Sequence, residues 1–274
     1  FIDSLNNATV KEDTEISQDV ISDIIQQIPS PLEISVLIKQ SGTKYDIGML
    51  NEPDKVSKYN ANYEKALNLG IYGTDLGYTN IYEQNQDGLD YMGSIKELAD
   101  GLNIGQFFDI ETIGRLATNS KNLDSLLLIT TKNFNSINQY LQEQKRANLS
   151  ILLLVGGWLE AMHITCQVAV KDFGNKELQE KIGEQKIILE NIMLLLSFYS
   201  NSDPSIKALS GDMTSLQKAF EEIKITKTYK ESTFKIVDGV MVIEDNSSSE
   251  VEITDDNIRE IQSIVNSIRN KVIK

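Results

Sequence analysis

Hydrophobic residues recur along most of this chain at the helical spacing of three to four positions. The chain has four prolines in 274 residues, so long segments can stay helical without interruption. In the last such segment, one helical face is lined by Ile258, Ile261, Val265, Ile268 and Val272. The pattern predicts helices at about 15–28, 31–41, 57–84, 87–101, 105–119, 123–146, 149–173, 176–200, 204–224 and 255–273.

Residues that typically cap helices mark several of these boundaries. Ser30 to Glu33 has the form of a capping box with proline in the first turn. Asn175 and Asp203 are expected to cap the helices that follow them, and the last helix is expected to begin near Thr254 or Asp255. Gly42 is expected to end the second helix.

One segment departs from the helical pattern. Residues 232–245 contain two β-rich runs joined by Asp238-Gly239, a strong signal for a two-residue hairpin turn. Residues 246–250 are polar and are expected to form a loop before the last helix. The sequence therefore predicts one small β-hairpin near the C-terminus.

Short connections between the predicted helices favour antiparallel packing of neighbours. The predicted fold is mainly α, an antiparallel helical bundle or a layered array of helix hairpins, in a single domain spanning residues 15–274. A solenoid is an alternative, although no fixed repeat period is evident. Residues 1–14 are polar and acidic, and we expect them to be a flexible tether from a processed terminus or a lipid anchor.

Charge and composition exclude several functions. The formal net charge is −14, of which residues 1–35 contribute −6 and residues 238–260 contribute −7. Such acidity opposes binding to nucleic acid or to an anionic membrane surface. One His and one Cys exclude multi-imidazole sites, disulfide frameworks and Cys-rich zinc sites. No cofactor, phosphate-loop or nucleophile-elbow motif is present, so we expect neither a cofactor nor a resident metal.

The helix predicted at 57–84 carries small residues at helical spacing. Glycine costs a helix interior about 1 kcal/mol relative to alanine, so several on one face need a compensating cause. Close approach of a second helix would supply it, and substitution of Gly73 by leucine is then expected to be strongly destabilising. The stripe comprises Ala66, Gly70, Gly73 and Gly77.

The opposite face of this helix combines a carboxylate with aromatic residues. Asp75 lies near Tyr78 and Tyr82, and six of the ten tyrosines fall between positions 59 and 91. Tyrosines join apolar area to a hydrogen-bonding tip, so this face could line a ligand cleft. The alternative is that these tyrosines are half-buried core residues whose hydroxyls satisfy Asp75 and backbone groups.

The helix predicted at 149–173 is almost uncharged. Asn148, Glu160 and His163 interrupt its apolar run, which favours a buried core helix over a membrane span. A carboxylate such as Glu160 must there be paired, hydrogen-bonded or protonated, with Arg115 or a tyrosine as its candidate partner. Trp158 lies beside it in sequence, and the Gly156-Gly157 pair is expected to be a packing notch.

Glu160 and His163 also have the Glu-x-x-His spacing of helical metal sites. Because the chain has one His, a dinuclear site cannot form, and a mononuclear site would need a borrowed carboxylate. The alternative is that His163 is a satisfied interior histidine. Cys166, three positions further on, is expected to be buried and inert.

Three segments resemble exported, mostly helical and often lipid-anchored proteins of Bacteroidetes without an assigned activity. The resemblance covers about residues 29–200 and implies an all-helical domain in the cell envelope, periplasmic or membrane-anchored. It implies no reaction. The segments are Pro29 to Ser35, Lys65 to Tyr78 and Gly156 to Glu160.

These observations favour a non-enzymatic envelope protein that binds a small molecule or a protein partner in a cleft between the helices at 57–84 and 149–173. One alternative is a hydrolase or mononuclear metal enzyme that uses Glu160 as its general base. Another is an interaction protein without a ligand site. The residues expected to bind the ligand are Asp75, Tyr78, Tyr82, Trp158, Glu160 and His163.

Overall fold

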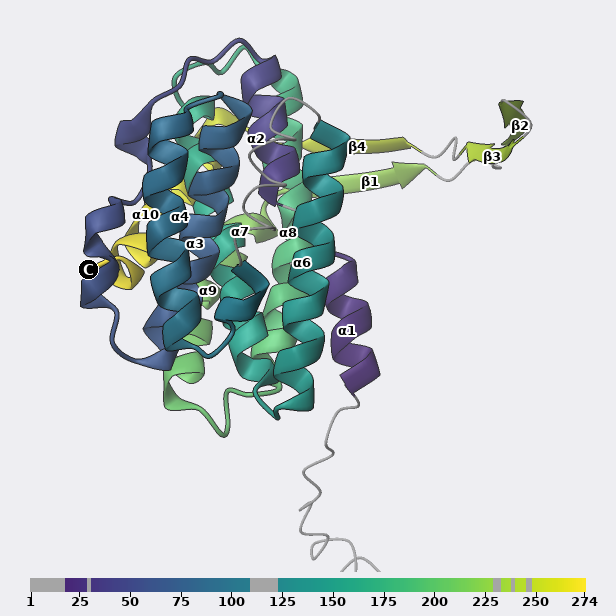
Figure 1. The fold of residues 1–274 in the computed structure, drawn as a ribbon. Coiled ribbons are helices and arrows are strands. Elements are labelled where there is room, and N and C mark those ends of the chain that lie inside the picture. Colours follow the sequence, from purple (N-terminus) through teal and green to yellow (C-terminus); the bar gives the residue numbers. More distant parts are fainter. Residues whose placement is uncertain (1–17, 29–30, 109–122, 229–232, 238–239, 245–247) are drawn as a thin grey trace, which may run out of the picture.

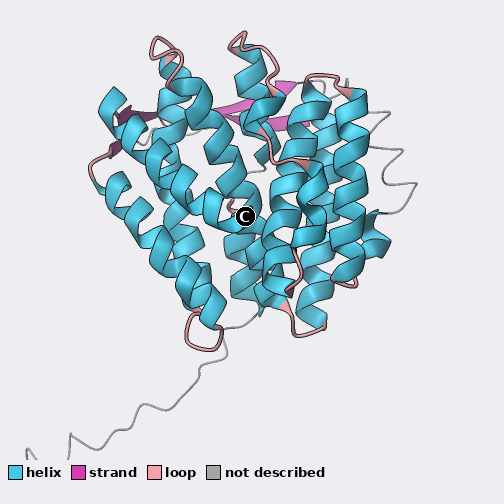
Figure 2. Cartoon of the chain, turned by 90° about the vertical axis from the view of Figure 1, so that its left-hand side faces the viewer, coloured by secondary structure: helices cyan, strands magenta, loops and turns pink. Residues whose placement is uncertain are grey.

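A computed structural model describes residues 18–28, 31–108, 123–228, 233–237, 240–244 and 248–274. The chain is mainly α-helical, as predicted, and its helices pack side by side around a central one (Figures 1 and 2). The described helices are α1 (Gln18–Gln26), α2 (Pro31–Gln40), α3 (Asn62–Ile81), α4 (Asn85–Gly101), α6 (Leu123–Glu143), α7 (Ala147–Ala169), α8 (Lys176–Ser197), α9 (Pro204–Glu221) and α10 (Asp255–Val272).

Several predicted helix ends are confirmed by hydrogen bonds. The side chain of Asp203 accepts from Ser205 N, and that of Asn175 accepts from Leu178 N. Thr254 caps α10 in a capping box. Gly42, with φ +81°, follows the end of α2. Ser30, the first residue of a predicted capping box, lies outside the described residues, as do residues 109–119 of the helix predicted at 105–119, whose residues 105–108 form a 3₁₀ helix.

The segment before α3 is not the α-helix that the sequence predicts from residue 57. It contains two short 3₁₀ helices, η1 (Ile47–Met49) and η2 (Pro53–Lys58), and the α-helix begins at Asn62. A third 3₁₀ helix, η3 (Gly105–Phe108), follows α4. Proline suits the first position of η2, because the N–H group that it lacks would have no acceptor within a helix at that position.

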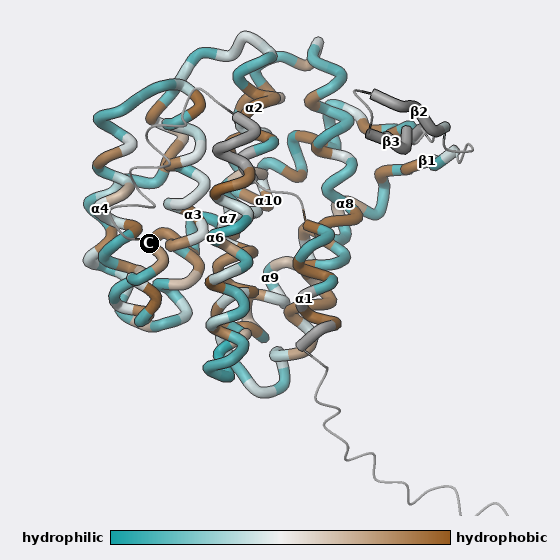
Figure 3. The backbone as a smooth tube through the Cα atoms, turned by 45° about the vertical axis from the view of Figure 1, so that its right-hand side comes forward, coloured by the Kyte–Doolittle hydropathy of each residue, from teal (hydrophilic) through white to brown (hydrophobic). Residues whose placement is uncertain are grey.

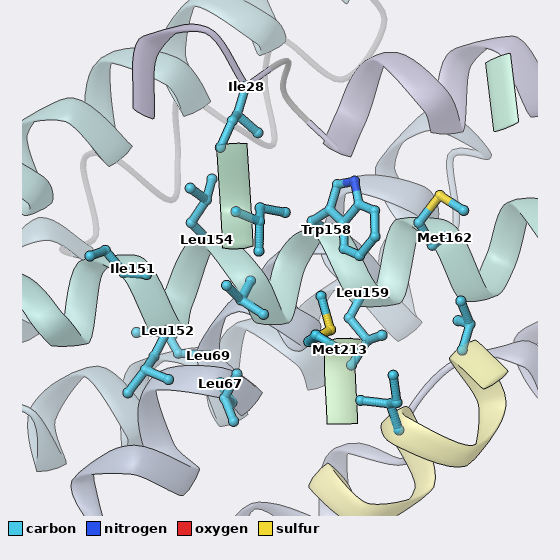
Figure 4. Close-up of a cluster of buried hydrophobic side chains, with 14 of the residues drawn as sticks. Ile28, Leu67, Leu69, Ile151, Leu152, Leu154, Trp158, Leu159, Met162 and Met213 are labelled. Atoms are coloured by element: carbon cyan, nitrogen blue, oxygen red, sulfur yellow. The ribbon is translucent and has the colours of Figure 1, made fainter. Parts of the chain in front are cut away.

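Central helix α7 contacts α2, α3, α6, α8 and α10, and nearly all of its side chains are buried. Figure 4 shows Trp158 on one side of α7, and Leu152 and Leu159 on the side where Leu67 of α3 and Met213 of α9 lie. Among the described residues, α7 is the one helix long and apolar enough to cross a membrane. Within its most apolar window 94% is buried in the protein, as expected for a core helix.

Along most of the other helices, polar and apolar residues alternate in short stretches (Figure 3). This alternation is typical of helices with one buried and one solvated face. On α10, for example, Ile258, Ile261, Val265 and Ile268 are buried, as the sequence predicts.

Helices α3 and α7 approach closely through glycines from both sides. A Cβ atom on Gly70 would overlap the carbonyl oxygen of Leu153 and lie 2.6 Å from Gly157 N. A Cβ on Gly156 would overlap the carbonyl oxygen of Leu67. The predicted packing notch is therefore present, but Gly73 has no part in it, because a Cβ there would meet nothing within 4 Å.

The predicted β-hairpin is present and belongs to a longer ribbon. β2 (Thr233–Val237) pairs with β3 (Val240–Glu244) in antiparallel register, with Val237 opposite Val240. β1 (Lys224–Thr228) pairs with β4 (Ser248–Glu252), where the sequence predicts the end of a helix and a polar loop. The ribbon leaves the body between α9 and α10, and β2 and β3 lie well away from the helices (Figure 1).

The glycine contact gives a first test of the fold. Gly70→Ala should destabilise the protein by about 1–3 kcal/mol, because its methyl group would collide with the backbone of α7. Gly73→Ala is the matched control on the same helix, and it should stabilise by about 0.5–1 kcal/mol by removing backbone freedom. Urea unfolding of both variants measures the difference, and equal effects would contradict the assigned contact.

Candidate functional site

A buried ion pair between α7 and α10 lies at the centre of the candidate site. Arg269 Nε is 2.5 Å from Glu160 Oε2, and Arg269 Nη2 is 2.6 Å from Glu160 Oε1. Glu160 is 0% exposed and Arg269 is 5% exposed. This two-pronged geometry satisfies both carboxylate oxygens, as a charge taken out of water requires.

The sequence pattern did not predict Arg269 as the partner of Glu160. The proposed alternative, Arg115, lies outside the described residues. A signal was nevertheless present, because Arg269 is four positions after Val265 and eight after Ile261, on the apolar face of α10. A charged residue on such a face needs a buried counter-charge.

Asp75 of α3 adds a second carboxylate to the ion pair. It is 0% exposed, and its Oδ2 accepts a hydrogen bond of 3.2 Å from Asn51 N. Burial, followed by repulsion from Glu160, raises the pKa of Asp75 well above its usual range, and Arg269 opposes this only in part. Asp75 therefore favours its neutral form, whose O–H can donate to Glu160 within hydrogen-bonding reach.

His163 lies one turn after Glu160, and each of its ring nitrogens lies close to a protein oxygen. Its Nδ1 is 2.7 Å from Asn266 Oδ1, and its Nε2 is 3.0 Å from the carbonyl oxygen of Met49. Burial, then the charge of Arg269, lowers the pKa of His163. A neutral imidazole has one N–H and donates to one of these two oxygens, so His163 is a hydrogen-bonded interior histidine, the structural alternative raised by the sequence.

These side chains converge on the irregular segment before α3. The carbonyl oxygen of Met49 accepts a hydrogen bond of 3.3 Å from Arg269 Nη2. The same oxygen is 3.0 Å from His163 Nε2. Two residues later, Asn51 N donates to Asp75. Residues 49–51 have no α-helical or sheet partner for these groups, so the polar cluster supplies the hydrogen bonds that regular structure would otherwise make.

Tyrosines continue the same role along the segment. Tyr91 Oη donates to the carbonyl oxygen of Asn51 at 2.9 Å, and Tyr72 Oη donates to that of Glu52 at 2.9 Å. Burial raises the pKa of both phenols, so both remain neutral donors. The clustered tyrosines of α3 and α4 thus hydrogen-bond to the backbone, as the structural interpretation of the sequence expects.

Tyr78 and Tyr82 lie further along the chain from Asp75, and residues 43–46 contact both of them. The ring of Tyr45 stacks on that of Tyr78 with centroids 5.4 Å apart. Tyr82 Oη donates to the carbonyl oxygen of Thr43 at 2.7 Å, and Asp46 N donates to Tyr78 Oη at 3.3 Å. Residues 43–46 of the chain itself thus contact tyrosines that the sequence assigns to a ligand.

Trp158 is the candidate residue that lies apart from the others. It is two positions before Glu160, so it points to nearly the opposite side of α7. Its Nε1 donates to Gln185 Oε1 of α8 at 2.9 Å (Figure 4 shows the indole). The structure therefore brings together Asp75, Glu160 and His163, places Tyr78 and Tyr82 beside them along α3, and separates Trp158.

The cluster does not have the geometry of a metal centre. Among the described residues, no group of three or more His, Cys, Asp or Glu side chains is arranged to hold a metal ion. Both oxygens of Glu160 are engaged by Arg269, and both ring nitrogens of His163 face protein oxygens. A catalytic Glu160 would also need access for a substrate, and none of its surface is exposed.

The fold and the cluster define a helical domain with a buried polar core and a projecting β-ribbon. Comparison with protein-family models, curated proteins and solved structures finds no match. The resemblance to exported Bacteroidetes proteins and the envelope location remain predictions.

The ion pair can be tested by removing one partner or both. Arg269→Met should lower the free energy of unfolding by about 3–5 kcal/mol, because it leaves Glu160 charged and buried without a counter-charge. Adding Glu160→Gln to this variant removes that charge and should recover part of the loss. Denaturant unfolding of the single and double variants measures the coupling, and simple additivity would show that the two residues do not interact.

The backbone-binding role of the tyrosines gives a separate test. Tyr91→Phe removes the donor to the carbonyl oxygen of Asn51 and should cost about 1–3 kcal/mol of stability. Tyr63→Phe is the control, since Tyr63 is partly buried at the start of α3, away from residues 49–53. Thermal unfolding of both variants distinguishes the two positions, and equal melting temperatures would contradict the role of Tyr91.

Proposed function

We propose that this chain is a non-enzymatic interaction protein whose buried polar cluster is structural and whose partner contact is made by the β-ribbon. The observation that carries the first part is the complete burial of Asp75 and Glu160. A group that acts on a substrate must come within hydrogen-bonding reach of it. Here the backbone of Met49 and Asn51, residues of the same chain, hydrogen-bonds to the cluster.

In the described part of the chain, the ribbon packs on the body near its base. Val251 of β4 packs at Gly183 of α8, where a Cβ on that glycine would overlap Val251 Cγ1. In β1, by contrast, all side chains but one are exposed. The outer strands β2 and β3 extend beyond this base into solvent (Figure 1). A firmly held base with a projecting end suits an element that reaches toward another protein.

The sequence of the outer strands supports contact with a protein. β2 reads TFKIV and β3 reads VMVIE, so seven of these ten residues are apolar. A two-stranded hairpin is only marginally stable by itself, and its open edges can pair with another strand. The partner class that fits is a protein that contributes an extended segment to an edge of β2 or β3.

Expectations about location follow from the sequence resemblance. If the chain is exported, its partner belongs to the cell envelope. This part of the proposal rests on the resemblance alone and can be tested by fractionating cells that make the protein naturally.

Shortening the ribbon tests the proposed contact. In one variant, residues 229–247 are replaced by Asn-Gly, so that β1 and β4 remain paired through a short turn. A photo-reactive residue at exposed Thr226 of the full-length ribbon identifies the protein bound in the native cells. With that protein purified, calorimetry should show at least about tenfold weaker binding for the shortened variant, a loss of about 1.4 kcal/mol.

Leu194→Ser is the control, because Leu194 is an apolar residue of α8 that is 46% exposed and distant in sequence from the ribbon. Its affinity for the partner should equal that of the unmodified protein. Unchanged binding by the shortened variant would overturn the proposal, as would equal losses in both variants.

A further inference from the structure

We propose that the buried cluster of Asp75, Glu160, His163 and Arg269 is a proton-controlled latch. It holds residues 45–53 against α3, α7 and α10 while Asp75 carries a proton, and it releases them when Asp75 ionises. This inference goes beyond the proposed function and does not depend on it. It explains how residues 45–53, which contact the buried cluster, are kept in place.

The cluster binds the segment directly. Arg269 and His163 meet the carbonyl oxygen of Met49, and Asp75 accepts from Asn51 N. The segment therefore contacts α3, α7 and α10 through groups whose charges depend on one another. The hydrogen bond from Asn51 N by itself favours ionised Asp75, but burial and the repulsion from Glu160 outweigh it, so ionisation destabilises the closed arrangement as a whole.

Asp75 carries the proton of this latch. Its Oδ1 is completely buried and has no hydrogen-bond partner among the residues that the structure describes, a costly state for a carboxylate oxygen. Glu160 is within hydrogen-bonding reach, and its own oxygens are held by Arg269. A proton on Asp75 Oδ1, donated to Glu160, satisfies both carboxyl groups. It also leaves one negative charge against the one positive charge of Arg269.

Among the described residues, no second positive charge lies beside Asp75 and Glu160. His163 favours its neutral form, since burial and Arg269 lower its pKa. The other titratable groups that face Asp75 are Tyr45 of the segment, Tyr72 of α3 and Tyr91 of α4, and burial raises the pKa of each phenol. Ionised Asp75 and Glu160 would thus share Arg269 alone. Opening of the segment would admit water and so weaken the repulsion between the two carboxylates.

The direction of the pH dependence follows from the raised pKa of Asp75. Closure is fully favoured below the ordinary aspartate pKa of about 4, where the carboxyl is protonated whether the segment is open or closed. Above that value the closed state holds one proton more than the open state. The equilibrium constant for opening should then rise by up to about tenfold per pH unit, until the raised pKa of the closed state is reached.

Hydrogen exchange measured by mass spectrometry tests the latch on the intact chain. Exchange of peptides covering residues 45–53 is followed between about pH 5 and 9 and corrected for the intrinsic pH dependence of amide exchange. We expect protection to fall with rising pH in this segment and to stay constant in α7 peptides around Val155. Constant protection in the segment would overturn the proposal, and so would an equal fall throughout α7, which would indicate global unfolding.

Asp75→Asn is the informative variant. An asparagine can accept from Asn51 N and donate to Glu160, so it reproduces the protonated aspartate but cannot ionise. The segment should then keep constant protection over the whole pH range. Asp212→Asn, which removes a surface partner of Lys271, should retain the slope of the unmodified protein. An unchanged slope in Asp75→Asn would assign the effect to another group and overturn the latch; the unmodified protein decides the question if this variant does not fold.

Discussion

A single counter-charge makes the polar interior of this protein tolerable. Arg269 neutralises Glu160 in a fully buried pair, and that pair in turn gives Asp75 a site for its proton. Isolated carboxylates at these depths would be far too costly, since a buried charge is stable only when it is paired and hydrogen-bonded. The hydrogen bonds to Met49 and Asn51 depend on the same three side chains. The same three side chains thus fix both the position of α10 and the path of the segment before α3.

The cluster also explains why an irregular segment can be buried in a helical protein. A helix satisfies its own backbone, whereas an extended stretch must find partners elsewhere. Around residues 49–53 those partners are side chains, among them Tyr72 and Tyr91. Aromatic residues suit this task because the ring adds to the core while the hydroxyl reaches a carbonyl group. The features that suggest a ligand cleft in the sequence are the ones that hold the chain's own backbone.

How much could be predicted from the sequence differed between local and long-range features. Helices, caps at Asn175 and Asp203 and the β2–β3 hairpin were predictable, because each depends on neighbouring residues. That Asp75 and Glu160 lie close together could be suspected, because both are isolated carboxylates among apolar residues. That Arg269 is their counter-charge could not be predicted, because it depends on how α10 packs on α7. Gly70 and Gly73 show the same limit: both belong to one glycine stripe, and only the first faces α7. The strands β1 and β4 are polar and show no apolar alternation, so their pairing left little trace in the sequence.

The distance along the chain between the members of the ion pair has a consequence for synthesis. Arg269 follows Glu160 by 109 residues and Met49 by 220. A ribosome therefore produces both carboxylates and the segment they bind well before the guanidinium that stabilises them. Until α10 arrives, α3 and α7 can approach through their glycines only with their carboxylates solvated or protonated. Completion of the core is accordingly a late step, because Asp75 and Glu160 must stay solvated or protonated until Arg269 is in place.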